Sequence, residues 1–200
     1  MRLAHLVGSL SLASILLPMS LITTQGAETK MHTLALLSHP GHWQIINDGV
    51  MGGRSQSQLS EVVGEGQPHK LRFSGKVSLE NNGGFASVSR TLNQEEQHLV
   101  QQGSPNRINL SALGDGKRYQ LRLKVLKQGQ LVGYKANFAT QTAKEQHWSF
   151  APEDFIETFR GSDYPDRPHP DFTQLVAVGL LIGEGQAGEF ELQLNHLGFQ

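Results

Sequence analysis

The stretch RYQLRLKV, residues 118–125, decides the fold class that this sequence predicts. Along its whole length a polar or charged side chain alternates with an apolar one, which is the period of a β-strand with one buried face. The apolar positions are Tyr119, Leu121, Leu123 and Val125. We therefore expect a half-buried strand of an antiparallel sheet here.

The same alternation recurs in three other stretches. They are KLRFSGKVSL at 70–79, VGYKANF at 132–138 and EFELQLNHL at 189–197. In the first of them the expected buried face consists of Leu71, Phe73, Val77 and Leu79. A fifth stretch, LVAVGLLIG at 175–183, is apolar throughout, which predicts a strand that is buried on both faces.

Turn signals separate these stretches, while helix signals are few. The turn clusters are NNGG at 81–84, GDGK at 114–117 and GEGQAGE at 183–189. LNQEEQHLVQQG, which begins at Leu92, predicts a short helix or an irregular loop, and PEDFIETF predicts one helical turn from Pro152. The pattern as a whole indicates an all-β chain, a single antiparallel sandwich or barrel with at most short helical turns.

Composition excludes several classes of function. The chain has 200 residues, 22 of them glycine, and a formal net charge of -1, so it is turn-rich and lacks the clustered Lys and Arg of a nucleic-acid surface. It has no cysteine, which excludes disulfides, thiolate nucleophiles, iron–sulfur clusters and cysteine-type zinc sites. We expect no cofactor and no nucleic-acid partner.

The N-terminal segment resembles a secretory signal peptide. Residues 1–27 begin with one positive charge at Arg2, continue with a largely apolar run at 6–22 and end in the small and polar residues TTQGA. We expect export to the periplasm or another extracytoplasmic space, followed by a short linker at 28–40 and one domain at 41–200. Two alternatives stay open: an uncleaved anchor in the inner membrane, which is the only membrane contact we expect, and organellar targeting.

The glycine-rich stretch IINDGVMGGRSQS, at 45–57, invites a chemical interpretation. It lacks the lysine of a phosphate-binding P-loop, the helix that follows a dinucleotide fingerprint, and the alternating carboxylates of a calcium loop. We therefore expect a tight turn, in which Asp48 accepts hydrogen bonds from backbone N–H groups and Val50 and Met51 enter the core.

Histidines and carboxylates give weak catalytic signals. The closest histidine groupings are His39 with His42 and His169 with Asp171, and neither is a metal-binding motif, so we expect no metal site. Carboxylates cluster at 153–171, where a hydrolase would need two of them to face each other across a cleft. These are Glu153, Asp154, Glu157, Asp163, Asp166 and Asp171, with Arg160 and Arg167 near enough in sequence to neutralise them.

Three arginines beside glycine-rich or aromatic segments remain of interest. Arg54, Arg90 and Arg160 occur in GGRS, SVSR and FRG. Such arginines could bind an anion or a carbohydrate, or could pair internally with Asp48.

Five blocks in this order resemble the complex I intermediate-associated protein 30 family. They are W-x-x-x-NDGVMGGRS from Trp43, FSGKVSLENNGGFASV from Phe73, GDGKRY from Gly114, FIETFRG from Phe155 and GEFEL from Gly188. The resemblance spans about residues 41–199 and implies a galactose-binding-domain-like, jelly-roll β-sandwich. Mitochondrial members of the family are assembly chaperones for respiratory complex I and are not catalysts, so the resemblance implies a protein partner among respiratory-complex subunits.

Three hypotheses follow. The first is a non-enzymatic binding or assembly module that presents loops at one end of the sandwich to a protein partner. The second is a carbohydrate- or small-anion-binding module of the cell envelope, with Asp48, Arg54, Asn82 and Arg160 as ligand- or partner-binding residues. Trp148 and Tyr164 are its candidates for an aromatic sugar platform. The third is a hydrolase that uses carboxylates at 153–171.

Overall fold

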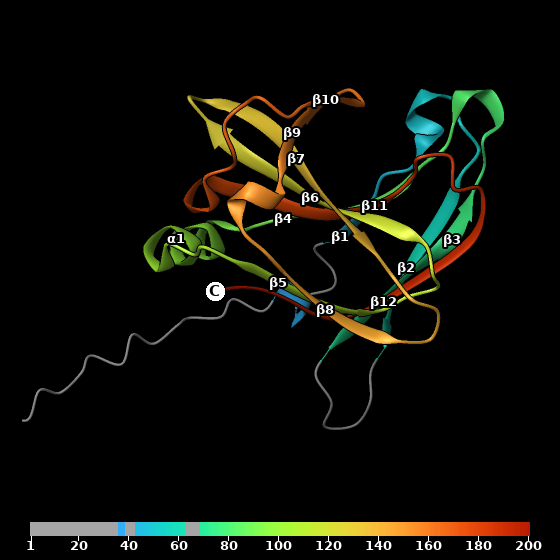
Figure 1. Cartoon of the computed structure of the whole chain (residues 1–200), viewed down its shortest axis with the longest axis horizontal. Helices are drawn as coiled ribbons and strands as arrows, with labels where there is room; N and C mark the ends of the chain where they lie inside the picture. The colour runs from blue at the N-terminus through green and yellow to red at the C-terminus, as the bar shows by residue number, and fades with distance from the viewer. Residues whose placement is uncertain (1–35, 39–42, 63–68) are drawn as a thin grey trace, which may run out of the picture. The chain divides into compact units, whose positions relative to one another are not determined.

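The computed structural model describes residues 36–38, 43–62 and 69–200 of the chain. Within these ranges two antiparallel sheets pack face to face, so the predicted jelly-roll sandwich is confirmed (Figure 1). The predicted signal peptide and most of the predicted linker lie outside the described residues. No helix in the described ranges is long and apolar enough to cross a membrane.

One sheet has seven strands in the order β1-β4-β11-β6-β7-β9-β10. In that order the strands are β1 (Trp43–Ile45), β4 (Ala86–Thr91), β11 (Leu175–Ile182), β6 (Arg118–Lys127), β7 (Gln130–Ala139), β9 (Ile156–Phe159) and β10 (Ser162–Tyr164). Neighbours along this sheet are antiparallel, and apart from the sequence-adjacent pairs β6–β7 and β9–β10 they come from separate parts of the sequence.

The other sheet has five strands in the order β2-β3-β12-β5-β8. In that order the strands are β2 (Gln56–Val62), β3 (Lys70–Val77), β12 (Gly188–Phe199), β5 (Ile108–Leu113) and β8 (Glu145–Phe150). The helical elements are α1 (Gln94–Gly103) and the 3-10 turns η1 (Leu36–Ser38), η3 (Asp48–Met51), η4 (Glu80–Asn82), η5 (Pro152–Asp154) and η6 (Phe172–Gln174).

The core lies between the sheets, where the period-two alternation predicts it. Tyr119, Leu121, Leu123 and Val125 are all buried in β6, and the inward positions of β3, β7 and β12 are buried likewise, with Val132 only partly so. The prediction was wrong for Leu79, which is 51% exposed because β3 ends two residues earlier. The continuously apolar strand β11 is buried at six of its eight positions, as predicted.

Two hairpins of the seven-stranded sheet close with the same tight turn. Gln128 and Gly129 join β6 to β7, and Arg160 and Gly161 join β9 to β10. All four residues have positive φ angles, 50° and 77° in the first turn and 49° and 83° in the second. Positive φ at both central positions matches the right-handed twist of the flanking strands, and it costs a non-glycine residue such as Arg160 more than it costs glycine.

Helix α1 takes the place of the helix or loop predicted after Leu92. Asn93 accepts a hydrogen bond from the Glu96 backbone N–H at 2.9 Å, and Glu96 accepts one from the Asn93 N–H at 2.9 Å, which is a reciprocal capping box. The Glu96 carboxylate also pairs with the buried guanidinium of Arg90 on β4. Arg90 therefore joins the helix to the sheet.

Candidate functional site

The glycine-rich stretch predicted as a tight turn is built around the carboxylate of Asp48. Asp48 is fully buried and accepts four hydrogen bonds. Ser55 donates its N–H at 2.9 Å and its hydroxyl at 2.5 Å, and the N–H groups of Gly84 and Phe85 donate at 2.7 and 3.3 Å. The predicted capping role of Asp48 is confirmed, and its reach extends to a second loop 36 residues away.

Two glycines leave room for this carboxylate. A Cβ atom at Gly53 would lie 2.4 Å from Cγ of Asp48, and one at Gly83 would lie 2.6 Å from its Oδ2. The blocks DGVMGGRS and ENNGGFASV thus meet around one side chain. Their glycines are needed for close packing. The two blocks form a hydrogen-bonded cluster around Asp48, the Asp48 cluster, which holds the loops of η3 and η4 together.

The same contacts set the charge state of Asp48. Burial works to raise the pKa of Asp48, but the hydrogen bonds from the Ser55 hydroxyl and from the N–H groups of Gly84, Ser55 and Phe85 outweigh it and hold the pKa below its ordinary value. Asp48 is therefore an ionised structural group that is buried from solvent and hydrogen-bonded at both carboxylate oxygens.

Val50 and Met51 correct one expectation. Both were predicted to enter the core, but they are 76% and 66% exposed. The 3-10 turn η3 buries only Asp48 and directs the two apolar side chains outward. Leu79, in the facing loop, is exposed as well. The loops held by Asp48 therefore present an apolar surface to solvent.

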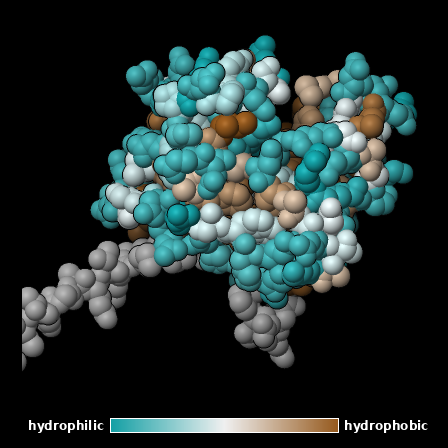
Figure 2. Space-filling view, viewed as in Figure 1, coloured by the Kyte–Doolittle hydropathy of each residue, from teal (hydrophilic) through white to brown (hydrophobic). Residues whose placement is uncertain are grey.

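Beside this surface lies a groove on the outer face of the seven-stranded sheet. Its volume is about 870 Å³, within the range of ligand sites. The apolar lining residues are Met51, Leu79, Phe85 and Leu181, and the charged ones are Arg122, Lys135, Arg160 and Glu184. Figure 2 shows a hollow between the β9–β10 hairpin and the loops that carry η3 and η4, with hydrophobic atoms exposed on those loops.

The floor of the groove is formed by outward-facing residues of β11, β6 and β7. Arg122 on β6 lies between Gly179 of β11 and Lys135 of β7, and Gln120 lies opposite Leu181. Arg122 also lines a second, smaller hollow of about 210 Å³ along the same face, and Gly179 is part of the same lining. Arg122 thus lies where the two hollows meet.

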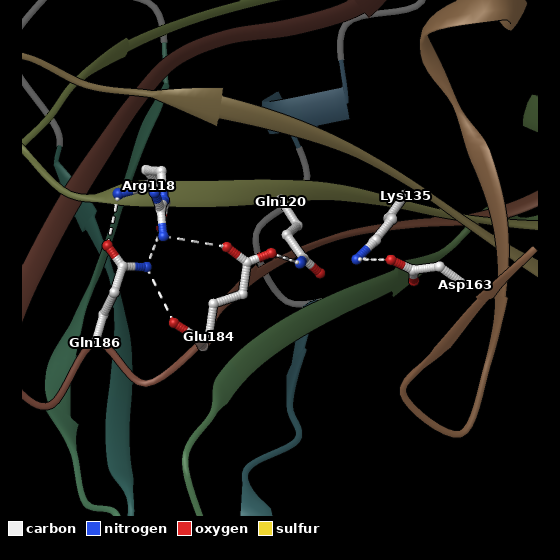
Figure 3. A network of polar contacts seen from close by, with 7 residues as sticks. Arg118, Gln120, Lys135, Asp163, Glu184 and Gln186 are labelled. Atoms are coloured by element: carbon white, nitrogen blue, oxygen red, sulfur yellow. Dashed lines mark hydrogen bonds and ion pairs between the residues drawn. The ribbon is translucent and has the colours of Figure 1, made fainter. Parts of the chain in front are cut away.

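A network of polar contacts fixes the side chains around the floor (Figure 3). Glu184 accepts a hydrogen bond from the Gln120 amide at 2.9 Å and pairs with Arg118 at 3.6 Å, while Gln186 binds the backbone of Arg118 from the other side. Lys135 pairs with Asp163 at 2.8 Å. Both acidic groups of the network are therefore neutralised by cations of this chain.

Arg122 is bound less completely than its neighbours. It donates one hydrogen bond, from Nη1 to the amide oxygen of Gln120 at 3.0 Å, and no carboxylate of the described ranges lies within ion-pair distance of it. Burial lowers the pKa of the Arg122 guanidinium, and the charge of Asp163 acts in the opposite direction. Arginine stays protonated in proteins, so a cation with unused donors faces the groove.

The structure brings together two of the four predicted site residues. Asn82 and Arg160 line the groove, Asn82 from η4 and Arg160 from the β9–β10 turn, where its guanidinium lies 5.1 Å from the ring centre of Phe159. Asp48 lies beneath the loops. Arg54 lies outside the groove and pairs with Glu80 at 3.0 Å, not with Asp48 as one hypothesis had it.

The predicted aromatic platform does not lie at the groove. Trp148 packs on Phe138 with ring centres 4.9 Å apart, and the guanidinium of Arg167 covers Tyr164 at 4.4 Å. Neither aromatic side chain is among the described residues that line the groove. Within that lining, Phe85 is the one aromatic residue.

Four of the six carboxylates at 153–171 make contacts within the fold. Glu157 pairs with Arg167 at 2.5 Å, Asp163 pairs with Lys135, and Asp154 and Asp171 accept hydrogen bonds from backbone N–H groups of nearby turns. None of the carboxylates at 153–171 lines the groove. The described residues also hold no cluster of three or more histidines and carboxylates that could bind a metal ion.

A third hollow, of about 420 Å³, lies on the outer face of the five-stranded sheet. His147 of β8 and His196 of β12 line it on either side of Ser111 of β5. Burial and the charge of His147 lower the pKa of His196. The sequence gives no sign that these two histidines lie close together, because the strands that carry them are far apart along the chain.

The sequence did not reveal that the floor residues belong to one site; these are Gln120, Arg122, Lys135, Leu181 and Glu184. The polar positions of RYQLRLKV indicated only a solvent-facing side of a strand. Gly179 within the apolar strand β11 does not mark the groove, because a Cβ there would lie 2.5 Å from the backbone oxygen of Val88 on β4, so this glycine reflects the close approach of a neighbouring strand.

Known structures share the sandwich. A family 11 carbohydrate-binding module of the cellulosomal cellulase Lic26A-Cel5E of Clostridium thermocellum superposes with a TM-score of 0.61 at 9% identity, over 83% of this chain and 93% of that chain. A family 11 module from the same organism, in complex with a β-1,3-1,4-mixed-linked tetrasaccharide, gives 0.59 at 10% identity, over 84% and 94%. At such identities the likeness establishes the fold alone.

Sequence comparison identifies the family. An uncharacterized protein of Schizosaccharomyces pombe, C9E9.15, is 23% identical over 82% of each chain. The family model of complex I intermediate-associated protein 30 matches residues 32–194, a range that includes the Asp48 cluster and nearly all of both sheets. The chain therefore belongs to the complex I intermediate-associated protein 30 family.

Proposed function

We propose that this protein is a non-catalytic binding module that takes part in the assembly of a protein complex. Its groove on the outer face of the seven-stranded sheet would receive a segment of the partner protein. The observation that carries the proposal is the groove itself, in which the exposed apolar side chains of Met51 and Leu79 flank a polar floor.

Physical reasons favour a protein segment as the ligand. Apolar side chains held out in solvent by a rigid loop cost free energy unless a partner covers them, and clusters of this kind mark interaction sites. The Asp48 cluster holds both loops in place, so little conformational entropy is lost when a partner covers Met51 and Leu79. The family name also refers to association with an intermediate of complex I, which agrees with a role in assembly.

Carbohydrate binding is the second candidate. It draws on the solved family 11 module that holds a tetrasaccharide. Sugar rings pack their C–H faces on aromatic side chains, however, and the described groove lining offers only Phe85 for this purpose. The apolar lining is otherwise aliphatic or thioether, which suits the side chains of a peptide.

The location of the mature protein bears on which complex it helps to assemble. We propose that residues 1–27 direct export, so that the partner is an envelope protein. A mature N-terminus near Glu28 in an extracytoplasmic fraction, measured by fractionation and intact mass, is the expected result. A full-length chain in the cytoplasm or inner membrane would contradict export and direct attention to subunits of the respiratory chain.

A paired screen tests the function. The purified protein is exposed in parallel to a random peptide display library and to a glycan array that includes mixed-linkage β-glucan. Peptides are expected to be retained and the glycans not. The variant Met51→Glu should weaken peptide binding about tenfold or more, because it places a charge in an apolar contact.

The adjacent Val50→Glu is the matched control. Val50 is at least as exposed as Met51 and lies on the same turn, but it is not part of the groove lining. It should bind peptides as the wild type does. Retention of glycans without peptides, or equal loss of peptide binding in both variants, would overturn the proposed function.

A further inference from the structure

The charges of the groove are unbalanced in favour of cations. Three cationic side chains, Arg122, Lys135 and Arg160, line it against the single carboxylate of Glu184. Glu184 is already bound by Arg118 and by the amide of Gln120, and Lys135 is already paired with Asp163. Among the described residues, Arg122 and Arg160 are the groove cations that have no carboxylate partner.

The neighbours of Arg122 orient its guanidinium so that it can bind a ligand. Glu184 holds the amide nitrogen of Gln120, and this leaves the amide oxygen of Gln120 to accept from Nη1 of Arg122. The guanidinium is thereby oriented by one hydrogen bond while its other N–H donors remain available on the floor. A preoriented planar fork of this kind matches the two oxygens of a carboxylate.

Among the described residues, Arg160 is the second unpaired cation of the groove, and its backbone conformation is unfavourable. It occupies a tight-turn position with a φ of 49°, which disfavours a long side chain and for which Asn or Gly is preferred. An unfavourable backbone conformation retained beside a groove is a reason to look for a binding role. The guanidinium of Arg160 lies against Phe159 and has no ion-pair partner among the described residues.

From these observations, and resting on the proposed function, we propose that the groove recognises an acidic protein segment. A carboxylate of the partner pairs with Arg122 on the floor, and an apolar side chain next to it covers Met51 and Leu79. Arg160 supplies the second positive charge from the edge. The mixture of two unpaired guanidinium groups with an aliphatic rim favours such a segment over a neutral sugar, which would leave both cations without a counter-charge.

The test is a double-mutant cycle on the full chain. Peptides enriched by the display screen are synthesised, together with analogues in which each Asp or Glu is replaced by Asn or Gln, and their affinities are measured by calorimetry. We expect the enriched peptides to carry an acidic residue beside an apolar one. Arg122→Gln should weaken the acidic peptide about tenfold or more and have little effect on its amide analogue.

Two further variants make the outcome specific. Arg160→Asn should weaken the acidic peptide by a smaller factor while it relieves the backbone of the turn. Lys76→Gln, which removes one positive charge from β3 of the other sheet, should leave the affinity unchanged and so controls for net charge. Thermal unfolding of each variant establishes that it is folded before its affinity is compared.

The results separate the two claims. Peptides that bind but show no preference for acidic residues, or an Arg122→Gln variant that weakens acidic and amide peptides equally, would overturn the acidic-segment inference and leave the protein-binding function intact. Retention of glycans with no peptide bound would overturn the function itself. Enrichment of acidic peptides with strong coupling to Arg122 would support both.

Discussion

Asp48 and Arg122 are two charged side chains near the same groove, and they differ in how many of their hydrogen-bond partners the protein supplies. Asp48 is fully buried and accepts four hydrogen bonds, all from its own chain. Arg122 is half-buried, donates one hydrogen bond to a neutral amide and lies on the floor of a groove. The first arrangement completes the structure, whereas the second leaves binding capacity unused.

The difference shows how a structural charge can be told from a binding charge in a chain of this kind. Both residues lie in stretches that the sequence marks as unusual or charged. What separates them is whether the protein itself supplies every partner. Substitutions at and around each of the two residues test this distinction.

Removing the carboxylate of Asp48 should cause the largest loss of stability. Asp48→Ala leaves the N–H groups of Ser55, Gly84 and Phe85 without an acceptor, and we expect the free energy of unfolding to fall by about 3 kcal/mol or more. Urea denaturation measures it. The exposed Arg54→Gln, which breaks only a surface ion pair, should stay within about 1 kcal/mol of the wild type. Similar losses in the two variants would refute the structural role of Asp48.

The glycines around Asp48 should tolerate no side chain. Gly53→Ala and Gly83→Ala would each place a Cβ within 2.6 Å of the carboxylate, and we expect a loss of about 1–3 kcal/mol as the packing shifts. Gly49→Ala is the control, because nothing lies within 4 Å of a Cβ built there. Equal midpoints of chemical unfolding for all three variants would contradict the close packing of Gly53 and Gly83 against the Asp48 carboxylate.

Arg160 allows stability and binding to be separated. Arg160→Asn should stabilise the fold by about 0.5–1 kcal/mol, because asparagine adopts positive φ at lower cost, and it should weaken binding of an acidic peptide. Gln128→Asn makes the same change at the equivalent turn position of the β6–β7 hairpin, away from the groove. It should give a similar rise in melting temperature without a change in affinity. Loss of peptide binding in both variants would contradict a specific role for Arg160.

The smallest expected effect concerns pH and the five-stranded sheet. Because the pKa of His196 is lowered in the folded state, the unfolded chain takes up the proton first as the pH falls below about 6.5. His196 thus supports the fold at neutral pH, and this support is lost on acidification. His196→Gln should make the decline in melting temperature between pH 7 and pH 5 shallower. An unchanged slope would contradict the assignment.

Much of the fold could be predicted from sequence, because the period of two is a local property. The inward residues of β6 and β12 follow from alternation alone, and the capping role of Asp48 follows from its place before a glycine cluster. The outward direction of Val50 and Met51 could not be predicted in this way. The one buried position of the 3-10 turn η3 is occupied by Asp48, so Val50 and Met51 face solvent.

The groove was beyond reach of the sequence for a different reason. Its floor combines Arg122, Lys135 and Leu181 from three strands, and its rim adds Asn82 and Arg160 from loops that lie far apart in the chain. Only the strand order β4-β11-β6-β7-β9 brings them to one face. Arg160 and Asn82 could be named as candidates because turn chemistry is local, whereas Arg122 could not, because a charged residue on the open side of a strand is ordinary.

The most direct test of the central claim is to map the binding face by NMR. Amide shifts of the labelled protein are recorded as a display-selected peptide is added. We expect the perturbed amides to concentrate around Gln120, Arg122 and Leu181 and in the turn at Arg160, on the outer face of the seven-stranded sheet. Perturbations centred on His147 and His196, on the opposite sheet, would contradict it.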